Sequence, residues 1–438
     1  MLSNNKVWQK IESYTFEKSP QEYGFSTRLA YENAWTEDFT QKAILEYKKF
    51  MYLVSVNEEM LSPSEIVDIV WHQHLIYSDS YNEFCKILEK QIKHLPSTHN
   101  SEEFQIFDDA FKNTEKKYNE TFGTSGWYLW TIKKDTDLLQ LNQKNITENQ
   151  LKTYLIIGLF AVTIFLIFVA RPVFISISNP YFLIGLYALF ILGLIVFMQF
   201  ITQYFQKLFI CEDYNLINKM NSFELIAIQK KHTQPIINAT LSQLIKEEQL
   251  VVENNQIKII HRRISKNPLE KAVRNSMLKT NPISYHQIFR SLSSKNVFKQ
   301  YLKSTENIIS HIKNSKEFQK IELFSYCFFG LFFSILFSRF YIGESRGKPT
   351  TFVVINLLIL VAFFFYFIKI KLNTLLRKSL ITAVKQQTPP SIKNNDLGWS
   401  FLALGTTIFG SELIAASDYE KKQQNSGSDG TSSSSCSS

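Results

Sequence analysis

Four long apolar stretches stand out in the pattern of hydrophobic and polar positions along the chain. The first, residues 153–170, contains no charged side chain over 18 positions. At about 1.5 Å per helical residue this length reaches ~27 Å, just enough to cross the hydrocarbon core of a bilayer. The others are residues 181–205, 323–340 and 352–370, and none holds more than one charge. The pattern predicts four transmembrane helices.

The predicted spans pair into two hairpins, at residues 153–205 and 321–371, because only short segments separate the spans within each pair. Pro172 and Pro180 bracket the first separator, which predicts a tight turn. Two hairpins leave the N-terminus, residues 206–320 and the C-terminus on one face of the bilayer.

The positions of lysine and arginine orient these hairpins. Ten flank the spans on the common face, and four lie in the two opposite loops. Cytoplasmic loops carry the excess of positive charge in membrane proteins. The first residues, MLSNNKVWQKIESYTFEK, have no apolar core and predict no cleavable signal peptide. We therefore expect a multi-pass protein of the bacterial inner (cytoplasmic) membrane, with both termini in the cytoplasm.

Residues 1–145 predict an all-helical cytoplasmic domain. Thr36 can cap a helix whose apolar positions recur at helical spacing, namely Ile44, Tyr47, Phe50, Met51 and Val54. The next helix is expected to open at Ser62-Pro63-Ser64-Glu65, read as a cap, an N1 proline and a capping-box glutamate.

Residues 206–320 predict a basic, winged-helix-like α+β module. Two short helical patterns precede LVVENNQIKII, which reads as two strands about an Asn-Asn turn, and three more helical patterns follow. Residues 222–321 hold 17 Lys and Arg against 7 Glu and no Asp, and thus the whole net charge of +9. Such a surface suits anionic lipid headgroups. The predicted recognition helix argues against specific nucleic-acid binding, because it offers only Asn238, Ser242, Gln243 and Lys246.

The remaining segments complete a mainly α-helical integral membrane protein with four transmembrane helices. Residues 372–418 are juxtamembrane and include a marginal apolar stretch, residues 399–416, expected to form an interfacial or re-entrant helix. Residues 419–438 form a Ser-rich tail with the composition of a disordered segment.

The stretch VDIVWHQHLIYSDSYNEFC, residues 67–85, carries the candidate metal-binding or catalytic side chains of this sequence. Asp68 and His72 are four residues apart and share one face of a helix. His74 lies about 160° round the helix from His72, so these two histidines cannot converge on one ion.

Two interpretations of this stretch stay open. In the first, His74 is a buried histidine with fixed partners, and Trp71 and Tyr81 are core residues. In the second, a transition metal such as zinc is held by side chains that include Cys85, His94 or His99 from the following segment. The candidate ligands are then Asp68, His72, His74, Cys85 and His94. No cofactor is predicted otherwise.

Other catalytic signatures are absent from the sequence. The four cysteines form no C-x-x-C pair, which argues against a zinc ribbon, a redox dithiol or a disulfide framework. There is no G-x-S-x-G, P-loop or G-x-G-x-x-G motif. We expect a non-catalytic binding, scaffold or sensor protein with a protein partner of unknown identity. The alternatives are a membrane-tethered winged-helix nucleic-acid binder and a metal-binding or metal-dependent enzyme that uses the W-H-Q-H region.

The segments FSTRLAYENAW, ILEYKKFMYL and SPSEIVDIVWHQHLIYSDSYNEFC resemble the N-terminal region of certain bacterial membrane proteins. Their D-x-x-W-H-x-H-L core is similar to that of the plant glycine-rich domain proteins. NPLEKAV, IGESRGKPTTF and the apolar stretch before the tail resemble the bacterial "near-uncomplex" membrane domain. The loop motif in this resemblance is Arg346, Gly347, Lys348 and Pro349. The tail departs from that pattern, because Ser replaces most of the expected Gly and Cys. The resemblance implies an architecture and no established activity.

Overall fold

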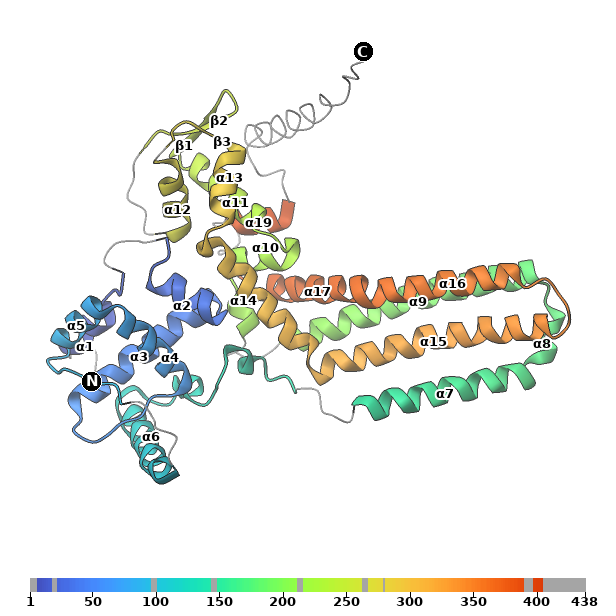
Figure 1. The fold of residues 1–438 in the computed structure, drawn as a ribbon, viewed down its shortest axis with the longest axis horizontal. Coiled ribbons are helices and arrows are strands. Elements are labelled where there is room, and N and C mark those ends of the chain that lie inside the picture. The colour runs from blue at the N-terminus through green and yellow to red at the C-terminus, as the bar shows by residue number, and fades with distance from the viewer. Residues whose placement is uncertain are drawn as a thin grey trace, which may run out of the picture. The chain divides into compact units, whose positions relative to one another are not determined.

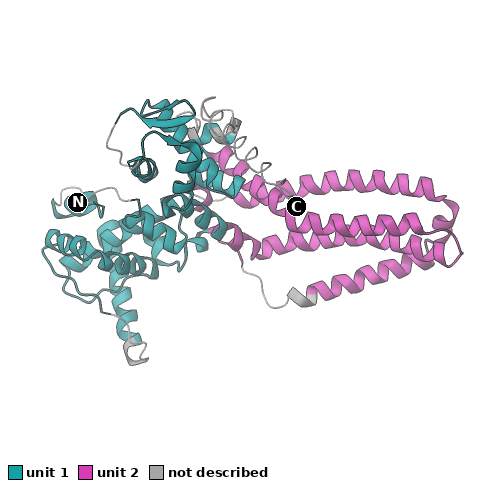
Figure 2. Cartoon of the chain, turned by 45° about the horizontal axis from the view of Figure 1, so that its top comes forward, with its two compact units in different colours: residues 1–138, 219–307, 388–438 teal, residues 139–218, 308–387 magenta. Residues whose placement is uncertain are grey.

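The computed structural model describes residues 6–17, 22–95, 101–142, 148–210, 216–261, 267–278, 280–389 and 397–404 (Figure 1). Backbone contacts divide the chain into two compact units (Figure 2). Unit 1 comprises residues 1–138, 219–307 and 388–438, and unit 2 comprises residues 139–218 and 308–387. The described part of the chain is mainly helical, as predicted, with one small sheet.

The N-terminal part of unit 1 is a set of packed helices. Their bounds are α1 Lys6–Ser13, α2 Phe25–Asn33, α3 Glu37–Val56, α4 Glu65–Ile76, α5 Ser78–Ile87 and α6 Ser101–Phe122, followed by the 3₁₀ helices η2 Trp127–Trp130 and η3 Asp135–Leu139. α3 begins where the sequence predicts, because the Thr36 side chain accepts a hydrogen bond from the backbone N of Phe39. Tyr47, Phe50 and Met51 of α3 are fully buried and form the centre of this core.

The predicted start of the next helix is wrong by two residues. Ser64, rather than Ser62, caps α4, since its side chain accepts from the backbone N of Val67. Glu65 is therefore the first helical residue and not the capping-box glutamate. Ser62 is held elsewhere: its backbone N and O both bond to the Thr114 hydroxyl of α6, at 2.9 and 3.0 Å.

The inter-span part of unit 1 contains the predicted hairpin. Strands β1 Leu250–Glu253 and β2 Gln256–Ile259 are antiparallel and joined by Asn254 and Asn255. Both asparagines are left-handed, with φ of 50° and 62°, as a two-residue hairpin turn requires. β3 Ile283–Ser284 adds a third antiparallel strand beside β2. The helices of this part are α10 Ser222–Lys230, α11 Gln234–Lys246, α12 Pro268–Met277, α13 Tyr285–Ser293 and α14 Asn296–Lys313, of which the last six residues belong to unit 2.

The start of the marginal apolar segment is also in unit 1. Helix α19, Leu397–Leu404, packs against α10 and α11 and buries Trp399 and Leu402. The rest of this segment and the Ser-rich tail lie outside the described residues, so their predicted structure stays a prediction. The predicted domain bounds are likewise left open, although residues of both predicted cytoplasmic domains contribute to unit 1.

Unit 2 holds four helices that are long and apolar enough to cross a membrane. They are α7 Glu148–Phe168, α9 Asn179–Phe209, α15 Lys316–Glu344 and the continuous run of α16 Thr351–Tyr366, a π-helical turn Phe367–Lys371 and α17 Leu372–Gln387. The second, third and fourth predicted spans each fall within one of these helices, and the first, residues 153–170, extends two residues past the end of α7. The predicted tight turn at Pro172 and Pro180 contains a short helix instead, α8 Arg171–Ser176, because a proline suits the first turn of each helix that begins there.

Apolar side chains hold unit 2 together. Phe197 of α9 stacks on Phe328 of α15, with ring centroids 4.8 Å apart. The guanidinium of Arg339, near the end of α15, donates to Asn179 Oδ1 at 2.8 Å and to the carbonyl of Ile177 at 2.7 Å. The first hairpin is therefore joined to the second by packing along the helices and by polar bonds at one end.

The loop between α15 and α16 carries Arg346, Gly347, Lys348 and Pro349, and all four are exposed. Gly347 has φ +60°, a conformation that favours glycine, and the backbone N of Lys348 donates to the carbonyl of Gly343. This is a helix-ending turn. The geometry accounts for the glycine of the motif and leaves the two basic side chains in solvent.

Candidate metal site on helix α4

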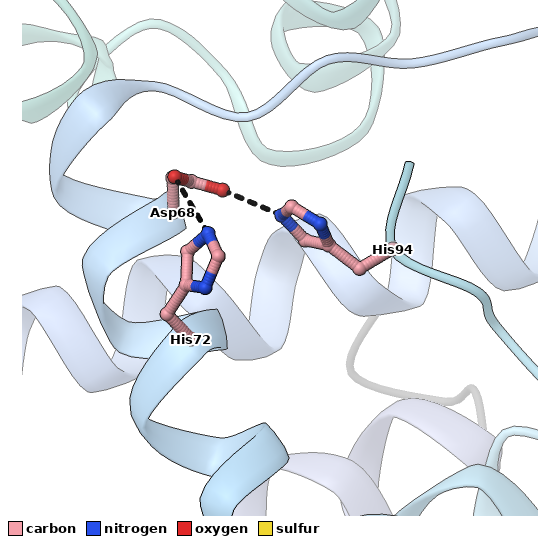
Figure 3. A group of neighbouring side chains, drawn as sticks. All are labelled: Asp68, His72 and His94. Atoms are coloured by element: carbon pink, nitrogen blue, oxygen red, sulfur yellow. Dashed lines mark hydrogen bonds and ion pairs between the residues drawn. The ribbon is translucent and has the colours of Figure 1, made fainter. Parts of the chain in front are cut away.

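Helix α4 and the segment that follows α5 bring three metal-ligating side chains together (Figure 3). Asp68 and His72 are neighbours on α4, with His72 Nε2 3.4 Å from Asp68 Oδ2. His94 comes from the extended segment after α5, and its Nε2 lies 2.9 Å from Asp68 Oδ1. One ligand atom from each residue lies within 4.8 Å of the others. The two imidazoles therefore approach the same carboxylate from two different elements.

Trp71 and Tyr81 position the segment that carries His94. Both are buried, at 5% and 6% exposure, as predicted for core residues. Trp71 Nε1 donates to the Tyr81 hydroxyl at 3.2 Å, and that hydroxyl donates to the carbonyl of Ile92 at 2.7 Å. The Trp71 and His94 rings also pack edge to face, with centroids 4.5 Å apart. These contacts hold the backbone two residues before His94 and the His94 ring itself.

The three side chains open onto a pocket of about 570 Å³. His94 is the most enclosed, with 15% of its side chain exposed, against 37% for Asp68 and 58% for His72. The wall of the pocket also includes Glu65 and Lys93. A ligand can therefore reach the group from solvent on the His72 side.

His74 lies apart from this group, in the aromatic core. It is fully buried, its Nδ1 lies 2.9 Å from the Tyr47 hydroxyl, and its Nε2 lies 3.1 Å from Ser80 Oγ. The rings of Phe16 and Phe84 surround it. Burial lowers the pKa of His74 to about 3, so the ring is neutral at physiological pH. Both of its nitrogens have partners, as the buried-histidine interpretation expects.

Cys85 is the other candidate ligand that the structure keeps away from the group. Its thiol is free and its side chain is 2% exposed. Burial in the same core raises the pKa of the Tyr81 hydroxyl beyond its usual range. Of the five predicted candidates, Asp68, His72 and His94 converge, and His74 and Cys85 are core residues. The further alternative, His99, lies outside the described residues.

Two imidazoles and one carboxylate form a ligand set that suits several metals. Zinc takes histidine and carboxylate ligands, and its catalytic or exchangeable sites keep at least one further position for water or another ligand. Non-haem iron sites use the same three side-chain types. The exposed face of His72 leaves room for such a position. Among the described residues no other group of three or more His, Cys, Asp or Glu shares this geometry.

Two plant proteins are similar to this chain over a short region. Glycine-rich domain-containing protein 1 of Arabidopsis thaliana is 32% identical over 95 residues, and glycine-rich domain-containing protein 2 of the same plant is 30% identical over 95 residues. Each match covers 20% of this chain and only 12% of the plant protein. The matches support the predicted similarity of the N-terminal region to the plant proteins.

No family model matches the chain. No solved structure matches it significantly either. The predicted resemblance to the near-uncomplex membrane domain therefore stays a prediction.

Proposed function

We propose that the protein is a membrane-anchored metal-binding protein, which acts as a binding or sensor module at the cytoplasmic face of the bacterial inner membrane. The observation that carries the proposal is the convergence of Asp68, His72 and His94 within 4.8 Å at the edge of an open pocket. Zinc is the metal that we expect, because it binds nitrogen and carboxylate ligands in a small, tetrahedral site.

The four apolar helices of unit 2 support the membrane anchor. The excess of lysine and arginine on one side of the predicted spans supports the cytoplasmic placement of the metal site. The basic inter-span residues, 206–320, are proposed to meet anionic lipid headgroups.

The side chains of α11 favour this role over specific nucleic-acid binding. The order of α10, α11 and the β1–β2 hairpin is that of a winged helix, which makes α11 the recognition helix. Yet Ser242 is buried, and Asn238 Oδ1 accepts a hydrogen bond from the Tyr285 hydroxyl at 2.7 Å. Gln243 donates to Glu247, the residue that directly follows the helix. Only Lys246 of the four predicted contact residues is left exposed without such a bond, and one lysine reads no base sequence.

The test is metal binding by the purified full chain in detergent. After treatment with a chelator and dialysis, Zn²⁺ is titrated and the bound metal is measured by isothermal calorimetry and elemental analysis. We expect one Zn²⁺ per chain, and Co²⁺ in its place should show the visible absorption of a four-coordinate site.

His94→Ala and His72→Ala should each lose this metal while the fold is kept. His232→Ala is the matched control, because His232 is an exposed histidine of the same unit and lies outside the group. The proposal would be contradicted if His94→Ala still bound one zinc per chain. It would also be contradicted if the unchanged protein and the three variants all bound zinc equally weakly.

A further inference from the structure

Two helices of unit 1 that are distant in sequence begin at one shared carboxyl group. Glu224 Oε1 accepts a hydrogen bond from the backbone N of Glu37, the first residue of α3, at 2.9 Å. Glu224 Oε2 accepts from the backbone N of Asn221, the cap of its own helix α10, also at 2.9 Å. A single side chain thus satisfies the free N–H groups of two helix N-termini. We name this the Glu37–Glu224 contact.

The side chain of Glu37 takes part in the same contact. Its Oε2 accepts from Asn221 Nδ2 at 2.5 Å and from the Tyr301 hydroxyl at 3.5 Å. Glu224 is 1% exposed, whereas Glu37 is exposed at the wall of a pocket of about 580 Å³. Water therefore reaches one carboxyl of the contact and not the other.

Among the described residues that line this pocket, no basic side chain neutralises the two carboxyls. The pocket wall includes Glu17 as well as Glu37 and Glu224, and none of its described residues is a lysine, arginine or histidine. Asp38 is the next acid on α3 and is paired with Lys42 at 2.6 Å. Among the described residues, Tyr301 of α14 also lies at this pocket. The start of α12 contributes Asn267, Pro268 and Leu269.

The other two helices packed on α10 add no neutralising charge. Lys246 of α11 is exposed and does not line the pocket, and the sequence of α19, LGWSFLAL, contains no titratable side chain. Burial raises the pKa of Glu224 to about 8, and the two backbone N–H bonds oppose this shift. The Glu37 side chain is exposed at the pocket wall, yet the protein atoms packed around its carboxyl displace part of the water and also raise its pKa.

We propose that the Glu37–Glu224 contact is a pH-sensitive connection between α3 and α10, which is firm while Glu224 carries a proton and weakens when both carboxyls are charged. The separated form leaves Glu224 in water, where its pKa returns to the ordinary value of 4.5. Between that value and about 8 the closed form holds the extra proton, so a rise in pH favours separation. Above this range both forms are charged and the effect levels off.

The separation is expected to be local to α10. Two further contacts tie the inter-span part of unit 1 to its N-terminal part: Lys295 pairs with Glu22 at 2.6 Å, and Lys303 Nζ donates to the carbonyls of Tyr31 and Glu32. Neither contact needs a protonated carboxyl, so α14 remains attached when the contact between α3 and α10 weakens.

The experiment is a distance measurement between spin labels on the two helices in the full chain, reconstituted in nanodiscs. Labels are placed at Val56→Cys, an exposed position at the end of α3, and at Lys230→Cys on α10 after the native cysteines have been replaced. The fraction of separated molecules is followed from about pH 5 to about pH 9. We expect the equilibrium constant for separation to rise by up to about tenfold per pH unit until about pH 8 and then to level off.

Glu224→Gln imitates the protonated carboxyl and should remove the pH dependence. Glu37→Gln removes one of the two charges and should reduce the pH dependence of the separation. This second variant tests the proposal even if Glu224→Gln does not fold. Glu32→Gln is the matched control, an acidic residue of α2 that does not line the pocket, and it should behave as the unchanged protein does. The proposal would be overturned if the distances in the unchanged protein did not depend on pH. It would also be overturned if both Gln variants kept the pH dependence of the unchanged protein.

Discussion

The hydroxyl of Tyr47 lies 2.9 Å from Nδ1 of His74, and this bond joins α3 to α4 at the centre of the N-terminal core. Replacing His74 by Ala removes the bond to Ser80 and the bond to Tyr47; Ser80 Oγ keeps the Tyr14 hydroxyl as a partner, but the Tyr47 hydroxyl stays buried without its bond to the imidazole. A buried polar group left without a partner costs about 1–3 kcal/mol. We therefore expect His74→Ala to lower the free energy of unfolding by at least this amount, measured by thermal or denaturant unfolding of the full chain in detergent.

His72→Ala is the matched control for that prediction, because the two histidines lie in the same helix and only one is buried. In metal-free protein, loss of the His72–Asp68 pair is expected to cost roughly 0.2–0.5 kcal/mol, as for exposed i,i+4 pairs. Equal destabilisation by the two variants without metal would contradict the different roles that we assign to them.

The glycine at position 330 allows α15 to approach α7 closely. A Cβ added there would overlap the side chain of Leu159 in α7. Gly330→Ala should destabilise unit 2 by about 1–3 kcal/mol, the usual cost of overpacking. The measurement is unfolding of the full chain in mild detergent with increasing denaturing detergent.

Gly158→Ala tests whether this effect comes from packing. No neighbouring atom lies within 4 Å of a Cβ at Gly158, so alanine there should be neutral or slightly stabilising. Adding Leu159→Ala to Gly330→Ala should recover part of the lost stability. A loss of stability from Gly158→Ala as large as that from Gly330→Ala would count against close packing as the cause.

The proposed orientation in the membrane predicts which positions an impermeant thiol reagent can reach in intact cells. After removal of the native cysteines, a cysteine at Glu344 should react, because this residue is exposed at the end of α15, next to the loop that leads to the fourth candidate span. Cysteines at Met60 and Ile260 should react only after the cells are opened. Reaction at position 260 but not at position 344 would reverse the orientation.

The proposed contact with anionic lipid predicts protection of exposed lysines in the inter-span residues. In nanodiscs with phosphatidylserine, Lys230, Lys231 and Lys258 should be modified more slowly by an amine reagent than in phosphatidylcholine. High salt should abolish the difference, since such attraction is screened. Lys112 of α6 is the control, with 64% of its side chain exposed. Equal rates in both lipids would contradict the contact.

The sequence alone determined the features that depend on neighbouring residues. The four apolar stretches each coincide with a long helix, Thr36 caps α3, and Asn254 and Asn255 form the hairpin turn. These features follow from hydropathy, side chain-to-backbone bonds and backbone conformation within a few positions, so a local pattern is sufficient to reveal them. The same holds for Asp68 and His72, which share a face because one helical turn separates them.

Only the tertiary structure decided the features that join distant positions. His94 is 26 residues from Asp68, and nothing local distinguishes it from Cys85 as a third ligand. Glu224 is 187 residues from Glu37, and a single sequence shows no trace of their contact. Ser64 rather than Ser62 became the helix cap because Thr114 of another helix binds Ser62. In each case the stabilising interaction is made with a residue that is distant in the sequence. The packing of the helices brings the two residues together, and that packing is a property of the whole chain.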